Sequence, residues 1–183
     1  MLISIFLFIS SITNANKSNN ELITSISSNI YKIILTQDSL YHDSIVNMHV
    51  DSGLNIYILR AELLSEINAE RLKVGLELLK INDTLNNVAQ NYAQYMSEND
   101  WYSHADKKGH KTIDRLHNAG YKKLFGGENI HNGPRTIHYV MKDWMESRPH
   151  SKNILNEFSI EIGIGYCNGY WVLDFGLWYP WLQ

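Results

Sequence analysis

The sequence predicts an α+β fold in which helices come first and an antiparallel β-hairpin comes last. Between residues 54 and 145, apolar residues recur at the three- and four-residue spacing of amphipathic helices. From residue 160 onward they alternate with other residues, as in a strand. Asn168-Gly169 separates two β-rich runs, and this dipeptide favours a tight turn between antiparallel strands. Helices followed by a hairpin are typical of layered α+β folds rather than of βαβ winding.

The beginning of the chain has the pattern of a secretory signal peptide. Residues 1–12 form an uncharged apolar run, and the small residues Thr13 and Ala15 follow at the first and third places of a cleavage site. The run is too short for a membrane-spanning helix of ~20 residues. We therefore expect residues 1–15 to be a signal peptide, with no transmembrane segment. The mature chain is expected to be extracellular, or periplasmic or at the cell surface in a bacterium.

The segment from residue 16 to residue 53 is rich in Ser, Asn and Ile and has no sustained periodicity. We interpret it as an N-terminal extension. Residues 54–183 are then of a length typical of one domain.

Four helices with apolar faces are expected in this domain. They lie between Leu54 and Gly75, from Asp83 or Thr84 to Met96, from Thr112 to His117, and between Pro134 and Pro149. Asp83 or Thr84 can accept hydrogen bonds from the free N–H groups at the start of the second helix. Pro149 is expected to prevent the fourth helix from continuing. The alternating run and the Asn-Gly turn then form the hairpin.

Composition excludes several classes of protein. The formal net charge is -3, whereas a duplex-binding module usually carries a basic surplus, so no nucleic-acid partner is expected. The single cysteine, Cys167, excludes an intramolecular disulfide scaffold and a multi-cysteine zinc site. No H-E-x-x-H or G-x-S-x-G motif occurs, which counts against a zincin peptidase and an α/β-hydrolase.

Four segments of the chain form a specific pattern when they are considered together. They are Trp101-Tyr102-Ser103-His104, Gly126-Gly127-Glu128-Asn129-Ile130, the run from Trp144 to Leu155, and the hairpin from Ile162 to Gly176. In this order and spacing they resemble the CAP superfamily of cysteine-rich secretory proteins, antigen 5 and pathogenesis-related 1 proteins. The resemblance is closest to the short, cysteine-poor SCP domain of bacteria. It extends from about Ala61 to Gly176 and includes Asn68-Ala69-Glu70-Arg71.

The resemblance implies a three-layer α-β-α sandwich with a central antiparallel sheet, and a cleft lined by two histidines and two acidic residues. His104 and His150 match the two histidines, and Glu128 matches the first acid. Neutral imidazoles with an optional carboxylate suit Zn²⁺ or another divalent cation that keeps an open water position. We therefore expect His104 and His150 to be metal ligands. The same two histidines and Glu128 are the candidates for any catalysis.

The second acidic residue departs from the family's pattern. Eukaryotic relatives have it three residues after the tryptophan of the fourth helix, where this chain has Ser147, and Glu146 stands one residue earlier. One residue turns a helix by ~100°, which gives Glu146 a different direction. We assign Glu128, Glu146 and Asn153 to the cleft as binding residues, and the completeness of the acidic pair stays open.

Three functions are compatible with this pattern. The leading hypothesis is a secreted, monomeric CAP protein that acts by binding an extracellular protein, lipid or cell-wall component rather than as an enzyme. The second is a metal-dependent, peptidase-like hydrolase, in which His104 and His150 hold Zn²⁺ and Glu128 acts on the bound water. The third is a lipid or sterol carrier with an apolar groove between helices.

Overall fold

The computed structural model describes residues 53–133 and 136–178. The predicted signal peptide, and the predicted extension up to residue 52, lie outside the described residues. The chain divides into two compact units, Met1–Ala61 and Glu62–Gln183. The described part of the first unit is the beginning of helix α4, and the second unit holds all the other elements. In the described residues, no helix is long and apolar enough to cross a membrane.

The helices and the final hairpin come in the predicted order, and two further strands lie between the helices. They are α4 (Gly53–Lys73), β1 (Lys80–Ile81), α5 (Asp83–Asn99), α6 (Thr112–Asn118), β2 (Leu124–Asn132), α7 (Ile137–Glu146), α8 (Arg148–Ile154), β3 (Ser159–Cys167) and β4 (Tyr170–Leu177). The first three predicted helices correspond to α4, α5 and α6, and the predicted hairpin corresponds to β3 and β4. The sequence pattern did not predict α8, the short strand β1 or the strand β2.

The four strands form one sheet in the order β1-β3-β4-β2. The three long strands are antiparallel, and the two residues of β1 add a parallel edge to β3. The β3–β4 turn has positive φ at both Asn168 (φ 48) and Gly169 (φ 90), as a two-residue hairpin turn with the strands' twist requires. The predicted hairpin is confirmed at these residues.

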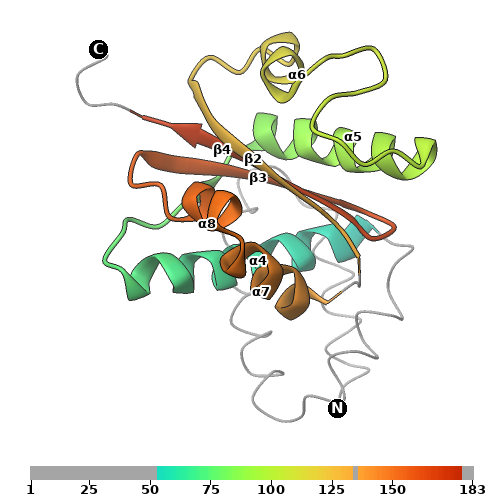
Figure 1. Ribbon diagram of the computed structural model, residues 1–183. Coiled ribbons are helices and arrows are strands. Elements are labelled where there is room, and N and C mark those ends of the chain that lie inside the picture. The colour runs from blue at the N-terminus through green and yellow to red at the C-terminus, as the bar shows by residue number, and fades with distance from the viewer. Residues whose placement is uncertain (1–52, 134–135, 179–183) are drawn as a thin grey trace. The chain divides into compact units, whose positions relative to one another are not determined.

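Helices cover both faces of this sheet. Within the second unit, α5 and α6 lie on one side, and α7, α8 and the end of α4 lie on the other (Figure 1). Every residue of β4 is buried, because this central strand has a covered face on each side. The three-layer α-β-α sandwich with antiparallel long strands is therefore confirmed.

The fourth predicted helix is split in two. The prediction that Pro149 prevents continuation was incomplete, because α7 already ends at Glu146 and Ser147 is extended (φ -91, ψ 114). Pro149 instead lies in the first turn of α8, where its missing N–H leaves no hydrogen bond unmade. His150 therefore lies on α8, a short helix that is separate from α7.

The N-cap of α5 is Asn82, so the expectation of Asp83 or Thr84 was wrong. The Asn82 side-chain oxygen accepts hydrogen bonds from the backbone N–H groups of Thr84 (2.9 Å) and Leu85 (3.1 Å). We expect Asn82→Ala to lower the free energy of unfolding by about 1 kcal/mol, measured by urea denaturation. Asn82→Ser keeps a capping oxygen and should stay close to wild type. An equal loss in both variants would contradict the capping role.

Candidate functional site

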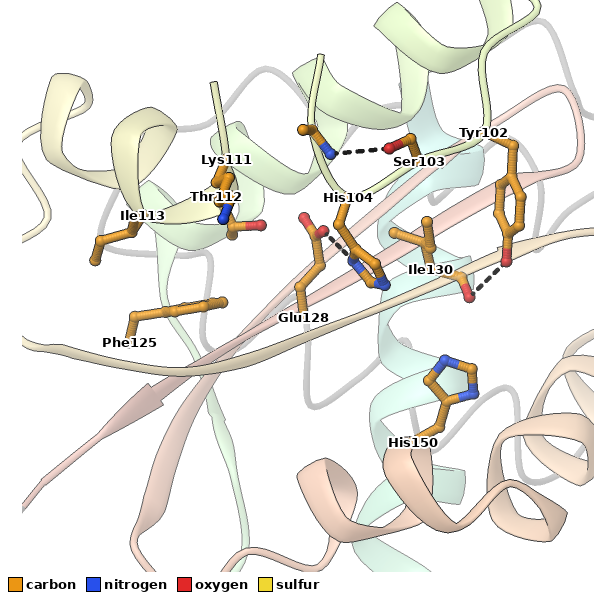
Figure 2. A pocket seen from close by; sticks show the side chains of 11 residues that line it. Tyr102, Ser103, His104, Lys111, Thr112, Ile113, Phe125, Glu128, Ile130 and His150 are labelled. Carbon is orange, nitrogen blue, oxygen red and sulfur yellow. Dashed lines mark hydrogen bonds and ion pairs between the residues drawn. The ribbon is translucent and has the colours of Figure 1, made fainter. Parts of the chain in front are cut away.

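A cavity of about 610 Å³ brings together the three residues that the resemblance nominated. His104 comes from the loop between α5 and α6, Glu128 from β2 and His150 from α8, and all three line the cavity (Figure 2). Ile113 and Phe125 form an apolar part of the wall. Because the three polar residues come from separate elements, only the folded chain can place them in one site.

Glu128 is held by two partners at the base of the cavity. Its side chain is 2% exposed, and its Oε1 accepts a hydrogen bond from Nδ1 of His104 at 2.7 Å. Its Oε2 accepts a hydrogen bond from Nη2 of Arg115 at 2.6 Å. A buried carboxylate requires such charge-assisted hydrogen bonds, since burial without them is costly. Each oxygen of Glu128 is thus engaged by a residue of this chain.

Arg115, on α6, is a site residue that the sequence analysis missed. Besides Glu128, its guanidinium donates hydrogen bonds to Thr112 Oγ1 (2.9 Å) and to the backbone oxygen of His104 (3.3 Å). Its Cζ lies 3.4 Å from the centroid of the Tyr92 ring, in a cation–π contact. A buried glutamate needs a cationic partner, so the burial of Glu128 implies a basic residue nearby. No spacing in the sequence indicates that this residue is Arg115.

The hydrogen bond to Glu128 determines which nitrogen His104 presents to the cavity. A carboxylate only accepts hydrogen bonds, so the proton of the neutral imidazole lies on Nδ1. The lone pair is then on Nε2. The His104 side chain is 57% exposed, and its ring extends from Glu128 into the cavity toward His150 (Figure 2). A carboxylate behind a histidine is also the arrangement that orients metal-ligating imidazoles.

His150 is kept neutral by its surroundings. Burial lowers the pKa of the His150 imidazole below its ordinary value, and the neighbouring imidazoles of His104 and His131 lower it further, because two protonated imidazoles repel each other. Its helix is tied to the sheet because the Asn129 side chain donates a hydrogen bond to the His150 backbone oxygen at 3.0 Å. A neutral imidazole has a lone pair available to a cation or to a hydrogen-bond donor.

Asn153 and Glu146, the other two predicted cleft residues, lie elsewhere. The Asn153 amide donates hydrogen bonds to Asn129 Oδ1 (2.8 Å) and to the backbone oxygen of Glu128 (3.4 Å), so it joins α8 to β2. Glu146 has a side chain that is 68% exposed, and its Oε1 lies 4.0 Å from Nζ of Lys142. Neither is among the described residues that line the cavity. Only Glu128 of the three predicted binding residues is a lining residue.

The donor set fits a cation at the two imidazoles better than at the carboxylate. His104 Nε2 and the neutral His150 are free of the Glu128 contacts, whereas both Glu128 oxygens are occupied. Within residues 53–133 and 136–178, no three His, Cys, Asp or Glu side chains gather as a metal-binding group. Metal binding by His104 and His150 stays a prediction.

Comparison with known proteins places these features in a family. The sequence model of the cysteine-rich secretory protein family, named CAP, matches residues 64–175. YkwD of Bacillus subtilis is 38% identical over 99 residues, which are 54% of this chain and 38% of YkwD. The membrane protein YlbC of the same bacterium is 30% identical over 118 residues, which are 62% of this chain and 33% of YlbC. The matched part of the chain thus spans 38% of YkwD and 33% of YlbC.

Solved structures are similar in the same region. An extracellular protein of Bacillus anthracis that contains an SCP domain has a TM-score of 0.61 and 25% identity, over 64% of this chain and 39% of that one. An outer surface protein of Borrelia burgdorferi has a TM-score of 0.61 and 27% identity, over 71% of this chain and 97% of that one. Since the family model covers more than half of the sequence, and the fold is similar to that of the two SCP-type structures, the chain belongs to the CAP superfamily of cysteine-rich secretory proteins, with a bacterial-type SCP domain.

Proposed function

We propose that this protein is exported and binds a ligand in the cavity through the imidazoles of His104 and His150, with a divalent cation such as Zn²⁺ as a shared partner. The observation that carries the proposal is the direction of the His104 ring. Glu128 holds its Nδ1–H, and the other nitrogen is left for the cavity. His150 adds a second neutral imidazole. A divalent cation at such a site supplies a Lewis acid that attracts an oxygen of the ligand.

The engagement of Glu128 supports binding over hydrolysis. A general base must present an accessible oxygen to the water that it deprotonates. The Glu128 side chain is only 2% exposed, and its two oxygens already accept hydrogen bonds from His104 and Arg115, so little of the carboxylate is open to a water. In this proposal Glu128 positions an imidazole, and it does not act on a bound water.

The rest of the cavity wall indicates the chemistry of the ligand. Ile113 and Phe125 offer an apolar surface, and Lys111 adds a cationic side chain among the lining residues. A ligand with an apolar body and an anionic oxygen group complements these features. Export is supported by the signal-peptide pattern of residues 1–15, and by the extracellular and outer-surface descriptions of the two similar structures.

The proposal predicts a histidine-dependent zinc site. We expect the full chain, freed of metal, to bind one Zn²⁺, measured by isothermal titration calorimetry. His104→Ala and His150→Ala should each weaken that binding by about 10- to 100-fold or more, since even residues that only orient a ligand have effects of that size. His117→Ala is the matched control, because His117 is an exposed residue on α6.

Three results would count against this proposal. A wild-type chain that binds no more Zn²⁺ than the His104→Ala/His150→Ala double variant would exclude the cation from the proposal. If the purified protein carries a lipid that the double variant also carries, the carrier hypothesis would explain the cavity better. Equal weakening in the His117→Ala control would assign the zinc binding to the surface instead.

A further inference from the structure

Asp174 is a buried acid directly behind the cavity, and the function proposed above does not use it. It lies on β4 opposite Glu128 in the antiparallel register of β2 and β4. Asp174 has no solvent exposure. Neither of its carboxyl oxygens receives a hydrogen bond from an N–H or O–H donor among the described residues. Residues directly opposite each other in an antiparallel pair project from the same face of the sheet, so the register places the carboxyl of Asp174 beside that of Glu128.

With His104 neutral, the charge balance of this cluster favours one proton on its two carboxyls. Arg115 supplies one positive charge, and its guanidinium contacts Glu128. Two ionised carboxyls would leave a net negative charge on two buried side chains, which is costly. Two carboxyls in contact also repel each other when both are ionised. With one proton on the pair, the cluster of Arg115, Glu128 and Asp174 is neutral.

The hydrogen bonds indicate which carboxyl takes the proton. Glu128 receives hydrogen bonds from His104 and Arg115, and these stabilise its charged form. Asp174 has no such donor among the described residues, so no hydrogen bond there stabilises its charged form. Burial raises the pKa of Asp174 well above its ordinary value, the negative charge of Glu128 raises it further, and Arg115 offsets only part of this effect.

We propose that Asp174 holds a proton and donates it in a hydrogen bond to Glu128, which makes Asp174 a positioning residue for the His104 imidazole. Glu128 then has three fixed partners. Asp174 is opposite it on β4, and His104 and Arg115 each donate a hydrogen bond to one of its oxygens. The carboxylate keeps its orientation, and His104 keeps its proton on Nδ1 and its lone pair toward the cavity. The effect on zinc or ligand binding rests on the proposed function, whereas the protonation of Asp174 does not.

The protonation can be measured directly by carbon NMR of the full chain labelled at the aspartate side-chain carboxyls. At about pH 7, where an ordinary aspartate is fully ionised, we expect one carboxyl signal of the protonated form. Asp174→Asn should remove that signal, and Asp83→Asn, at an exposed position on α5, should not. A wild-type spectrum in which every aspartate has the signal of a carboxylate would overturn the proposal.

The positioning role is tested with two replacements of Asp174. Asp174→Asn keeps the size and a neutral hydrogen-bond donor, so the ring-nitrogen NMR signals of His104 should keep the Nδ1–H form, and zinc affinity should stay within about twofold. Asp174→Leu keeps a similar volume without a donor. It should yield a mixture of the two His104 tautomers and weaken zinc binding by about 10- to 100-fold, as loss of an orienting residue does.

The two variants separate the alternatives. If Asp174→Asn disturbs His104 as much as Asp174→Leu, the aspartate acts as a charge and the proposal is wrong. If the leucine variant does not fold, the carboxyl signal of the wild type still decides the protonation. A wild type that binds no Zn²⁺ but shows the protonated carboxyl would refute the cation site and leave the Asp174–Glu128 pair standing.

Discussion

Replacing Arg71 with methionine is expected to lower the free energy of unfolding by about 4 kcal/mol. Arg71 is on α4 within the second unit, and it has no solvent exposure. Its guanidinium donates hydrogen bonds to four backbone oxygens, those of Glu77 (2.8 Å), Ile154 (2.7 Å), Asn156 (2.9 Å) and Ser159 (3.1 Å). One side chain therefore joins the end of α4 to the end of α8 and the start of β3.

The size of the effect follows from the four backbone oxygens that lose their hydrogen-bond donor when methionine replaces Arg71. Hydrogen bonds to a charged donor contribute about 1.5–3 kcal/mol each, and a buried acceptor without its donor costs about 1–3 kcal/mol. The total is smaller than the sum over four bonds, because burying the guanidinium is itself costly, and burial lowers the pKa of Arg71. Chemical denaturation followed by circular dichroism measures the difference.

Lys73→Met is the matched control for the arginine variant. Lys73 lies on the same helix, its side chain is 66% exposed, and it pairs with Glu70 on the surface. Exposed ion pairs contribute little, so we expect a change within about 0.5 kcal/mol. If Arg71→Met and Lys73→Met had equal effects, the four carbonyl contacts would not be the source of stability. Because Ile154 ends the helix that carries His150, the arginine variant should also loosen the cavity.

The elements that the sequence predicted well are those with a local physical cause. The Asn168-Gly169 turn is specified by two residues that tolerate positive φ, and the structure has the turn there. Helix α5 has a regular apolar stripe, and the structure has a helix there, from Asp83 to Asn99. The start signal was misread by one residue, because Asn82 also caps well and its side chain competes with those of Asp83 and Thr84.

The site was predictable only in part, because its contacts join residues that are distant in the sequence. The resemblance nominated His104, Glu128 and His150, and the fold brings them into one cavity. It gave no indication of Arg115, which reaches Glu128 from a different element, or of Asp174, which meets Glu128 through strand register. Charge compensation and register are properties of the folded chain, and a single sequence does not contain them explicitly.

The failure of Glu146 to reach the cavity has a geometric cause. Helix α7 ends at this residue, and Ser147 then adopts an extended conformation before α8 begins. The side chain of Glu146 is left 68% exposed beside Lys142. The cavity therefore contains one acidic lining residue in the described part of the chain, and Asp174 lies behind that residue as a second carboxyl.

Gly165→Ala is expected to destabilise the fold by about 3 kcal/mol, because α5 lies directly against β3 at this glycine. A Cβ at Gly165 would be 2.2 Å from the backbone carbon of Ala89, and at Gly163 it would be 2.1 Å from that of Leu85. Backbone atoms of a packed helix cannot rotate away as a side-chain end can, so α5 must shift from the sheet. Thermal and urea denaturation should both show the loss.

Gly75→Ala provides the comparison for this variant. The space around Gly75 is open, with nothing within 4 Å of an added Cβ, but its φ of 75 strains an alanine. We expect a loss of about 1 kcal/mol from that strain alone. Gly165→Ala should exceed it clearly and should also weaken zinc binding, because α5 supports Tyr92, on whose ring Arg115 rests. A Gly165→Ala protein as stable as Gly75→Ala would mean that α5 and β3 tolerate separation, and the close packing would then not be what holds Tyr92 against Arg115.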